Sequence, residues 1–195
     1  GMITTDSKEL YNKLIQFRTH GITKEEDNYI NKSDGPWYHE QQFLGYNYRI
    51  NDIQCALGKS QLDKSDYFLQ KRNNIAKKYN DAFKNLSGVA IPQINPSSNS
   101  AWHIYVLRLK LKKLNVDRKE IFEKLQDENL GVNVHYIPVY YHPYYQNLGY
   151  EEGLCPNAEW LYKRIITIPL YPKMNNNQVE MVINRVKKVI NYYLK

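Results

Sequence analysis

The 195-residue sequence is poor in features that would settle a function at once. It has only two cysteines, Cys55 and Cys155, and they lie far apart with no second cysteine or histidine at ligand spacing. This argues against a zinc site and a disulfide framework, so we expect no metal. No run approaches the ~18 apolar residues of a membrane span, and the N-terminus lacks the layout of a signal peptide. We therefore expect a folded cytoplasmic protein that does not contact membranes.

The motifs of several enzyme classes are also missing. No glycine-rich loop matches a dinucleotide or P-loop pattern, and no Gly-x-Ser-x-Gly nucleophile motif is present. The five histidines include no pair at metal-ligand spacing. His103 and His135 fall in predicted strands, where histidines are more often structural than catalytic.

The charge balance is basic, with a formal net charge of +7. The basic residues are spread over most predicted helices and form no patch interleaved with aromatic residues. Diffuse charge favours solvated helix faces over a nucleic-acid interface, and it also fits a small anionic ligand. Many of the eighteen tyrosines gather at 135–145, which reads HYIPVYYHPYY. Tyrosine clusters of this kind are typical of partly wet interfaces and ligand pockets.

Hydrophobic periodicity predicts a strand, a helix and a long helical stretch in the first half of the chain. An apolar run at 2–4 predicts the strand, and Asp6 with Glu9 predicts a capping box for the helix that follows. Asn51 with Gln54 predicts a second capping box. It would open either one long helix or two helices joined near Gly58, ending around residue 86.

The second half of the sequence predicts a compact α/β unit. Strands are predicted at 102–111, 132–136 and 165–168, and helices at 117–129, from 156, and at 175–193. Gly131 is the predicted stop of the first of these helices. Three strands interleaved with three helices predict a small open sheet covered on one side. The Pro-, Ser- and Asn-rich stretch 92–100 predicts a crossing loop or linker, and thus the region of a domain boundary.

The stretch at 45–58 reads GYNYRINDIQCALG and places polar side chains just before a helix. A helix N-terminus with an adjacent arginine favours anions, so Asn47 and Arg49 outline an anion site. Alternatively, Arg49 pairs with Asp52 and Asn47 merely closes a turn. The local pattern supports both interpretations equally.

The longer stretch GYNYRINDIQCALGKSQL resembles a segment of the DegT/DnrJ-type nucleotide-sugar aminotransferases. In that family it reads roughly Gly-Tyr/Phe-Asn-Tyr-Arg-Met-Thr-Asp/Glu-Leu/Ile-Gln-Ala-Ala-Leu-Gly, and its members are fold type I pyridoxal-phosphate (PLP) enzymes. The resemblance continues, in family order, through GMITTDSKELYNKLIQFRTHGI, WHIYVLRL, GVNVHYIPVYYHPYY and CPNAEWLYKRIITIPLYPKM. Within the family, VNVHYIPV and the length of the 38–46 loop most resemble the transaminase of the pseudaminic acid route, which aminates C4 of a UDP-linked 4-keto-6-deoxy sugar.

The resemblance implies an α/β fold that forms the C-terminal part of a fold type I transferase. Residues 1–50 would be a remnant of the large PLP-binding domain with an interface loop, and 51–86 a long linking helix. Residues 87–195 would be a small C-terminal α/β domain with a three-stranded, mainly antiparallel sheet.

The resemblance also implies site residues. The family counterpart of Asn47 reaches the PLP phosphate of the neighbouring subunit, and Tyr48 and Arg49 would line the same pocket. Beside the nucleotide-sugar pocket it places His135 and Tyr136 and, as weaker candidates, Tyr140 and Tyr141. The stretch YYHPYY departs from the family pattern, in which a histidine often follows the valine.

Family members are nearly twice as long, and their first half carries the Schiff-base lysine, the aspartate facing the pyridine nitrogen and the stacked aromatic residue. No lysine of this chain matches the catalytic one. The resemblance therefore implies no catalytic residue here, and neither transamination nor PLP binding by this chain alone. Expected partners are a UDP-sugar and either a separate N-terminal half or a second copy, in a homodimer or swapped oligomer joined at the edge of the N-terminal strand. The alternative is a non-catalytic binding or dimerisation module derived from the family.

Overall fold

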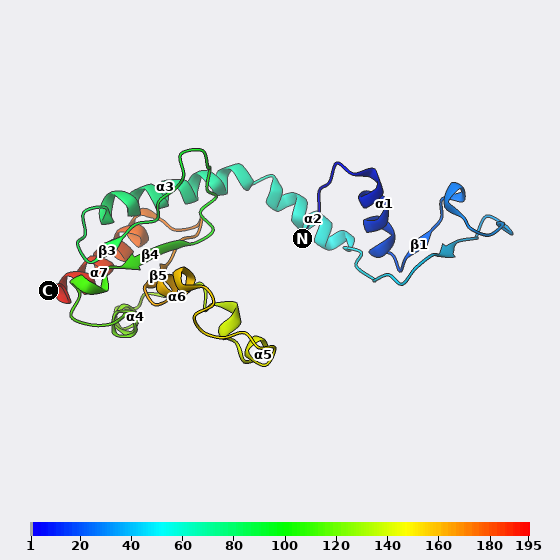
Figure 1. Ribbon diagram of the computed structural model, residues 1–195. Helices are drawn as coiled ribbons and strands as arrows, with labels where there is room; N and C mark the ends of the chain where they lie inside the picture. The colour runs from blue at the N-terminus through cyan, green and yellow to red at the C-terminus, as the bar shows by residue number, and fades with distance from the viewer. Residues whose placement is uncertain (1) are drawn as a thin grey trace. The chain divides into compact units, whose positions relative to one another are not determined.

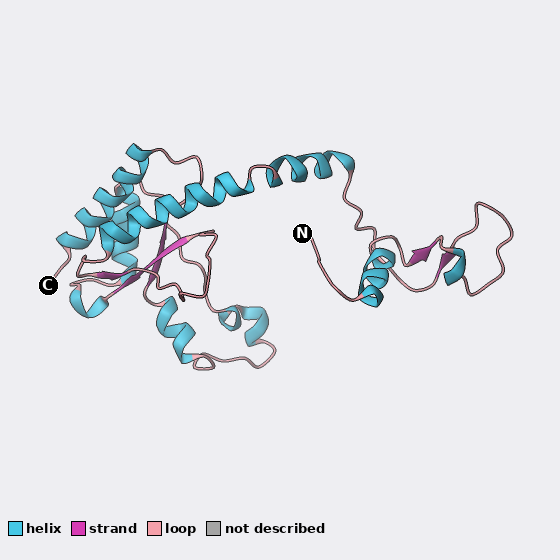
Figure 2. Ribbon diagram, turned by 90° about the horizontal axis from the view of Figure 1, so that it is seen from above, coloured by secondary structure: helices cyan, strands magenta, loops and turns pink. Residues whose placement is uncertain are grey.

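The computed structural model describes residues 2–195. The chain forms two compact units, of which the first ends at Asp63 and the second begins at Lys64. The β1–β2 pair belongs to the first unit and the separate β3–β4–β5 sheet to the second (Figures 1 and 2). Among the described residues, no helix combines the length and the apolar character that crossing a membrane requires.

The first unit is built from short elements. Strands β1 and β2 pair antiparallel, with Ile22 opposite Gln41. The elements are α1 (Lys8–Phe17), β1 (Ile22–Thr23), the 3-10 turn η1 (Glu26–Asn28), β2 (Glu40–Gln41) and α2 (Asp52–Leu62).

Two predictions for the start of this unit are wrong. Residues 2–4 form no strand, because this unit offers them no sheet neighbour. The expected self-association stays a prediction. The cap of α1 is Ser7 instead of Asp6, because Ser7 directly precedes the first helical turn and its Oγ accepts from the Leu10 N–H at 3.2 Å.

Two glycines allow the chain segments of the first unit to cross closely. Gly21 has φ +72°, and a Cβ there would lie 1.9 Å from the Phe43 carbonyl oxygen. A Cβ on Gly45 would lie 2.1 Å from the Gly21 nitrogen. Only glycine fits either position. The close approach lets the Tyr48 N–H donate to the Arg18 carbonyl at 2.9 Å, which fixes the segment around residue 47 to the end of α1.

The capping box of Asn51 and Gln54 is confirmed, and of the two alternatives for 51–86 the structure has two helices, although their joint does not lie near Gly58. The chain forms α2 and then α3 (Ser65–Phe83), with the break after residue 62 and Gly58 inside α2. Apolar residues of α3 are buried in a core, whereas α2 has no buried residue. The apolar periodicity over 51–86 therefore does not mark a single helix face packed on one core.

The second unit holds a three-stranded antiparallel sheet of order β3–β4–β5. Val89 lies opposite Leu109, and Tyr105 opposite Ile168. The unit also contains two 3-10 turns and four helices after α3. Its elements are β3 (Val89–Ala90), β4 (Tyr105–Leu109), η2 (Leu111–Lys113), α4 (Arg118–Asp127), η3 (Val139–Tyr141), α5 (Pro143–Gln146), α6 (Pro156–Tyr162), β5 (Ile165–Ile168) and α7 (Asn176–Tyr192).

One face of this sheet is covered by a hydrophobic core. Alternate residues of β4, from Tyr105 to Leu109, are buried there against side chains of α3, α4 and α7. In Figure 1, α3 and α7 lie on this core face, and the segment that carries α6 lies on the opposite side. We call that opposite side the outer face. The prediction of a small, mainly antiparallel sheet is confirmed, with the main core on one face, but α6 also covers one end of the outer face.

The third strand of the sheet is not the predicted one. Residues 132–136 make a single bridge, between Asn133 and Thr167, because the Asn133 side chain accepts the Val134 N–H at 2.7 Å and turns the chain away. The third strand is instead β3, a two-residue segment before Pro92. Helix α4 ends before Asn129, which takes the left-handed conformation expected at Gly131.

The stretch 92–100 connects β3 to β4 inside the second unit, so it is a crossing loop and the contact boundary lies elsewhere, after Asp63. The functional division into 1–50, 51–86 and 87–195 stays a prediction.

Candidate functional site

The candidate cofactor site is the segment before α2, which we call the 47–49 rim (Asn47, Tyr48 and Arg49). All three side chains are exposed. The backbone of Asn47 bridges to Thr19, and the Tyr48 ring stacks on Tyr46 with centroids 4.8 Å apart. Within residues 2–195 the side chains of Asn47 and Arg49 have no hydrogen-bond partner, and Arg49 does not pair with Asp52. The rim therefore presents an uncommitted amide and guanidinium.

The helix end next to the rim contributes less than the sequence suggested. The Asn51 side chain accepts the Gln54 N–H at 2.9 Å, and the Gln54 side chain accepts the Asn51 N–H at 3.2 Å. These two backbone donors are thus no longer free for an anion. The exposed side chains of Asn47 and Arg49 still offer the donors that a phosphate binds, so the rim fits a phosphate group.

The predicted substrate residues lie over the outer face of the sheet in the second unit. Thr167 is the register partner of Val106 and alternates with the core residues Ile166 and Ile168, which puts its side chain on the outer face. The His135 Nδ1 lies 2.9 Å from the Thr167 Oγ1. The Tyr136 ring meets the His135 ring edge-on at 4.5 Å and is 71% exposed. His135 and Tyr136, two of the predicted substrate residues, thus lie together over the outer face of the sheet, and the Tyr136 ring is open to solvent.

Tyr140 and Tyr141 lie in η3, and their hydroxyl groups already have partners. The Tyr140 hydroxyl donates to Glu159 at 2.8 Å, and the Tyr141 hydroxyl donates to Glu152 at 3.1 Å. Burial and the adjacent Glu159 carboxylate raise the pKa of Tyr140 to about 12, so this phenol remains a donor at neutral pH. A substrate would have to compete with these carboxylates for either tyrosine.

Glu159 is a site residue that sequence reasoning missed. It is 8% exposed and accepts the Gly153 N–H at 2.6 Å as well as the Tyr140 hydroxyl. Burial alone would favour the protonated carboxyl, but these hydrogen bonds outweigh it and hold the pKa of Glu159 below its ordinary value. The only sequence signal was an acidic residue in the first turn of α6, which is also typical of an exposed helix start.

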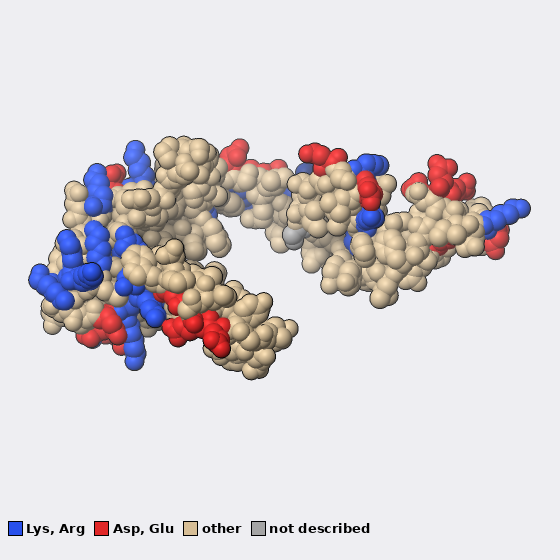
Figure 3. All heavy atoms as spheres, viewed as in Figure 1, with Lys and Arg blue, Asp and Glu red and all other residues tan. Residues whose placement is uncertain are grey.

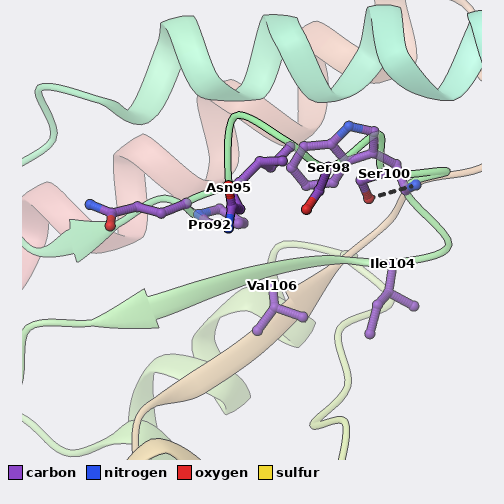
Figure 4. Close-up of a pocket in the computed structure, with 9 residues that line it drawn as sticks. Pro92, Asn95, Ser98, Ser100, Ile104 and Val106 are labelled. Carbon is purple, nitrogen blue, oxygen red and sulfur yellow. Dashed lines mark hydrogen bonds between the residues drawn. The ribbon is translucent and has the colours of Figure 1, made fainter.

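A hollow of about 330 Å³ lies between the crossing loop and β4. Figure 4 shows Asn95, Ser98 and Ser100 on the loop and Ile104 and Val106 at β4. The hollow exists because the pairing of β3 with β4 stops at residue 90, and Pro92 cannot donate a further ladder hydrogen bond. Its lining thus joins amides and hydroxyls to an apolar floor.

The whole chain matches known sugar aminotransferases. The model of the DegT/DnrJ/EryC1/StrS aminotransferase family matches residues 1–187. The chain is 41% identical over 192 residues to the spore coat polysaccharide biosynthesis protein SpsC of Bacillus subtilis, covering 97% of this chain and 49% of SpsC. It is 34% identical over 182 residues to the UDP-4-amino-4,6-dideoxy-N-acetyl-beta-L-altrosamine transaminase of Campylobacter jejuni, covering 93% of this chain and 46% of that enzyme.

A solved structure gives the same picture. Helicobacter pylori PseC, an aminotransferase involved in the biosynthesis of pseudaminic acid, superposes with a TM-score of 0.85 at 30% identity, covering 97% of this chain and 48% of PseC. The chain therefore belongs to the DegT/DnrJ/EryC1/StrS aminotransferase family.

The predicted family and fold class are thus confirmed, and the pseudaminic acid transaminases are among the relatives. The chain spans about half the length of the relatives it matches, and the match is to their C-terminal half. The family is PLP-dependent, and structures in PLP and PMP forms are among the structural neighbours.

Proposed function

We propose that this chain is the C-terminal portion of a PLP-dependent aminotransferase that acts on a UDP-linked 4-keto-6-deoxy sugar in the cytoplasm. The observation that carries the proposal is the 47–49 rim, whose exposed amide and guanidinium have no partner within residues 2–195. An amide and a guanidinium placed side by side offer several hydrogen-bond donors and a positive charge, which together suit a phosphate group. In this family, an uncommitted phosphate-binding rim fits a cofactor held by another part of the assembly.

In this proposal the Asn47 side-chain N–H donates to the phosphate of PLP bound in a neighbouring subunit. Arg49 adds a charge-assisted hydrogen bond, and the stack of Tyr48 on Tyr46 orients the rim. When bound, PLP supplies the electron sink for amino transfer. The chain's own contribution is to hold the cofactor's phosphate and leave the reactive end free.

His135 and Tyr136 would contact the nucleotide sugar. The Thr167 hydroxyl orients the His135 ring through Nδ1 and leaves Nε2 as its remaining polar atom for a substrate group. Tyr136 offers an exposed ring and hydroxyl beside it. Tyr140 and Tyr141 would act mainly by positioning the loop that follows.

The lysine that anchors PLP would come from a separate N-terminal half, since no lysine of this chain matches it. The purified chain should then show no Schiff-base absorbance with PLP and no amino transfer from glutamate. Adding the N-terminal half of a relative such as SpsC should restore both. In the restored enzyme, Asn47→Ala should weaken PLP binding about tenfold, the effect of losing one hydrogen bond to a charged group.

Asn191→Ala, on the exposed side of α7, is the matched control and should leave the affinity for PLP unchanged. Amino transfer by the chain alone would contradict the proposal. If the two halves never associate and the chain instead forms oligomers or binds UDP-sugar by itself, it is a binding or dimerisation module derived from the family.

A further inference from the structure

Two arginines share one tryptophan on the outer face of the sheet. The Cζ atoms of Arg108 and Arg164 lie 5.1 Å and 4.5 Å from the centroid of the Trp160 ring. Arg108 alternates in β4 with the buried residues Leu107 and Leu109, so its side chain projects from the outer face. Trp160 comes from α6, which covers this end of the outer face.

No carboxylate neutralises these arginines. All six ion pairs among residues 2–195 are formed by lysines. Two acidic residues of the neighbouring segment are engaged elsewhere, Glu159 by Tyr140 and Glu152 by Lys163. Figure 3 shows Lys and Arg side chains beside the acidic residues around α5 and α6. The two guanidinium groups therefore remain a pair of like charges at the surface.

The two guanidinium groups also keep free donors. Arg164 donates from one Nη to the Trp160 carbonyl at 2.7 Å, and the side chain of Arg108 has no hydrogen-bond partner within residues 2–195. A guanidinium has five N–H donors, so most of them are available. Since both Cζ atoms lie near one ring centroid, their separation cannot exceed twice the longer of the two distances. At low ionic strength, like charges within this separation repel each other, and a doubly charged anion that contacts both would relieve the repulsion.

Stacking on an indole also reduces the entropy that each arginine loses on binding. Planar guanidinium groups bind phosphate oxygens in pairs, which a single ammonium group cannot do.

We propose that Arg108 and Arg164, held on Trp160, form a binding site for a diphosphate group. The site lies on the same outer face as His135, because Thr167 holds His135 and pairs with Val106, two residues before Arg108 in β4. The assignment of this diphosphate to the nucleotide sugar rests on the proposed function. The binding of a phosphate anion does not.

The test is titration calorimetry of the full chain at low ionic strength with inorganic pyrophosphate, UDP and uridine. Pyrophosphate and UDP should bind, and uridine should not. Arg108→Gln should weaken pyrophosphate binding at least tenfold, whereas Arg185→Gln, the same charge change on α7, should have little effect. Arg108→Lys should recover only part of the affinity, because it restores charge without the paired donors.

Arg164→Gln removes a hydrogen bond to α6, so Arg108→Gln is the decisive variant, with circular dichroism confirming that it folds. The proposal is overturned if pyrophosphate does not bind, if Arg108→Gln and Arg185→Gln weaken binding equally, or if uridine binds as well as UDP. If the chain binds pyrophosphate but the protein reconstituted with an N-terminal half does not transaminate, the diphosphate site stands and only the proposed function is contradicted.

Discussion

The two units of this chain reach an ordered backbone by different means. In the second unit, strands and helices enclose a continuous hydrophobic core, whose first member along the sequence is Ile75. In the first unit, none of the described residues has a buried apolar side chain. Its backbone is instead held by close glycine contacts and by hydrogen bonds to a buried carboxylate, that of Glu40. The second unit thus has an interior of its own and the first has none, as the proposed completion of the first unit by another polypeptide segment requires.

Truncating one apolar side chain in each unit tests most directly how much apolar burial stabilises each of them. Phe83 is fully buried in α3, so Phe83→Ala should lower the free energy of unfolding by about 4 kcal/mol. Leu57 in α2 is 62% exposed, so Leu57→Ala should change it by less than about 0.5 kcal/mol. Urea denaturation followed by circular dichroism measures both.

The same Leu57→Ala variant should weaken association with an added N-terminal half, because that half would cover α2. Equal destabilisation by the two variants of the chain alone would show that the first unit has an interior of its own.

The predictions from sequence succeeded where one physical signal decided the structure. The apolar period of α7 and the capping box at Asn51 depend on local geometry alone, and the structure has both. The strand predicted at 132–136 failed because pairing depends on a distant neighbour and on the Asn133 side chain. The joint between α2 and α3 failed because periodicity does not say which apolar face is buried.

The candidate site shows the same limit. The exposed position of Asn47 and Arg49 before a capped helix followed from the local sequence. The contact between His135 and Thr167 joins segments far apart in the chain, and no spacing rule predicts it. Glu159 was missed because a buried acidic residue and an exposed helix-start residue look alike in sequence.

Replacing Arg72 tests how much polar contacts contribute to the stability of the second unit. Arg72 in α3 donates from one Nη to the carbonyl oxygens of Trp102 and His103 at 3.0 Å and of Leu170 at 3.5 Å. Trp102 has φ +48°, an unfavourable conformation for a non-glycine residue, so these bonds hold a strained turn before β4. Arg72→Ala should cost about 2 kcal/mol in urea denaturation, because it leaves partly buried carbonyl groups without donors.

Arg185→Ala is the control, since its side chain reaches a single carbonyl, that of Asn129, from an exposed position. It should cost less than about 0.5 kcal/mol. A neutral result for Arg72→Ala would mean that the hydrophobic core alone sets the stability of this unit.

The smallest expected effect is local and concerns Glu40, which is 7% exposed at the base of the loop over 24–39. Its carboxylate accepts the N–H groups of Ile30 and Asn31 at 2.7 Å and the Tyr38 hydroxyl at 2.9 Å. The Ile30 N–H, opposed by burial and helped by the other donors, lowers the pKa of Glu40 to about 2. Because the folded-state pKa is depressed, its contribution to stability is present above the unfolded value of about 4.3 and is lost as pH falls toward 2.

Glu40→Gln should open this loop at neutral pH, because in either orientation the amide nitrogen faces one of the two backbone donors. In ¹H–¹⁵N NMR spectra, the amide signals of Ile30 and Asn31 should move toward disordered positions, while those of α7 stay in place. In the unmodified chain the same two signals should titrate near pH 2. Glu26→Gln, in the exposed η1 turn, is the control and should leave both signals unshifted. Titration of these amides near pH 4 instead would mean that Glu40 is solvated and that the first unit lacks even this internal support.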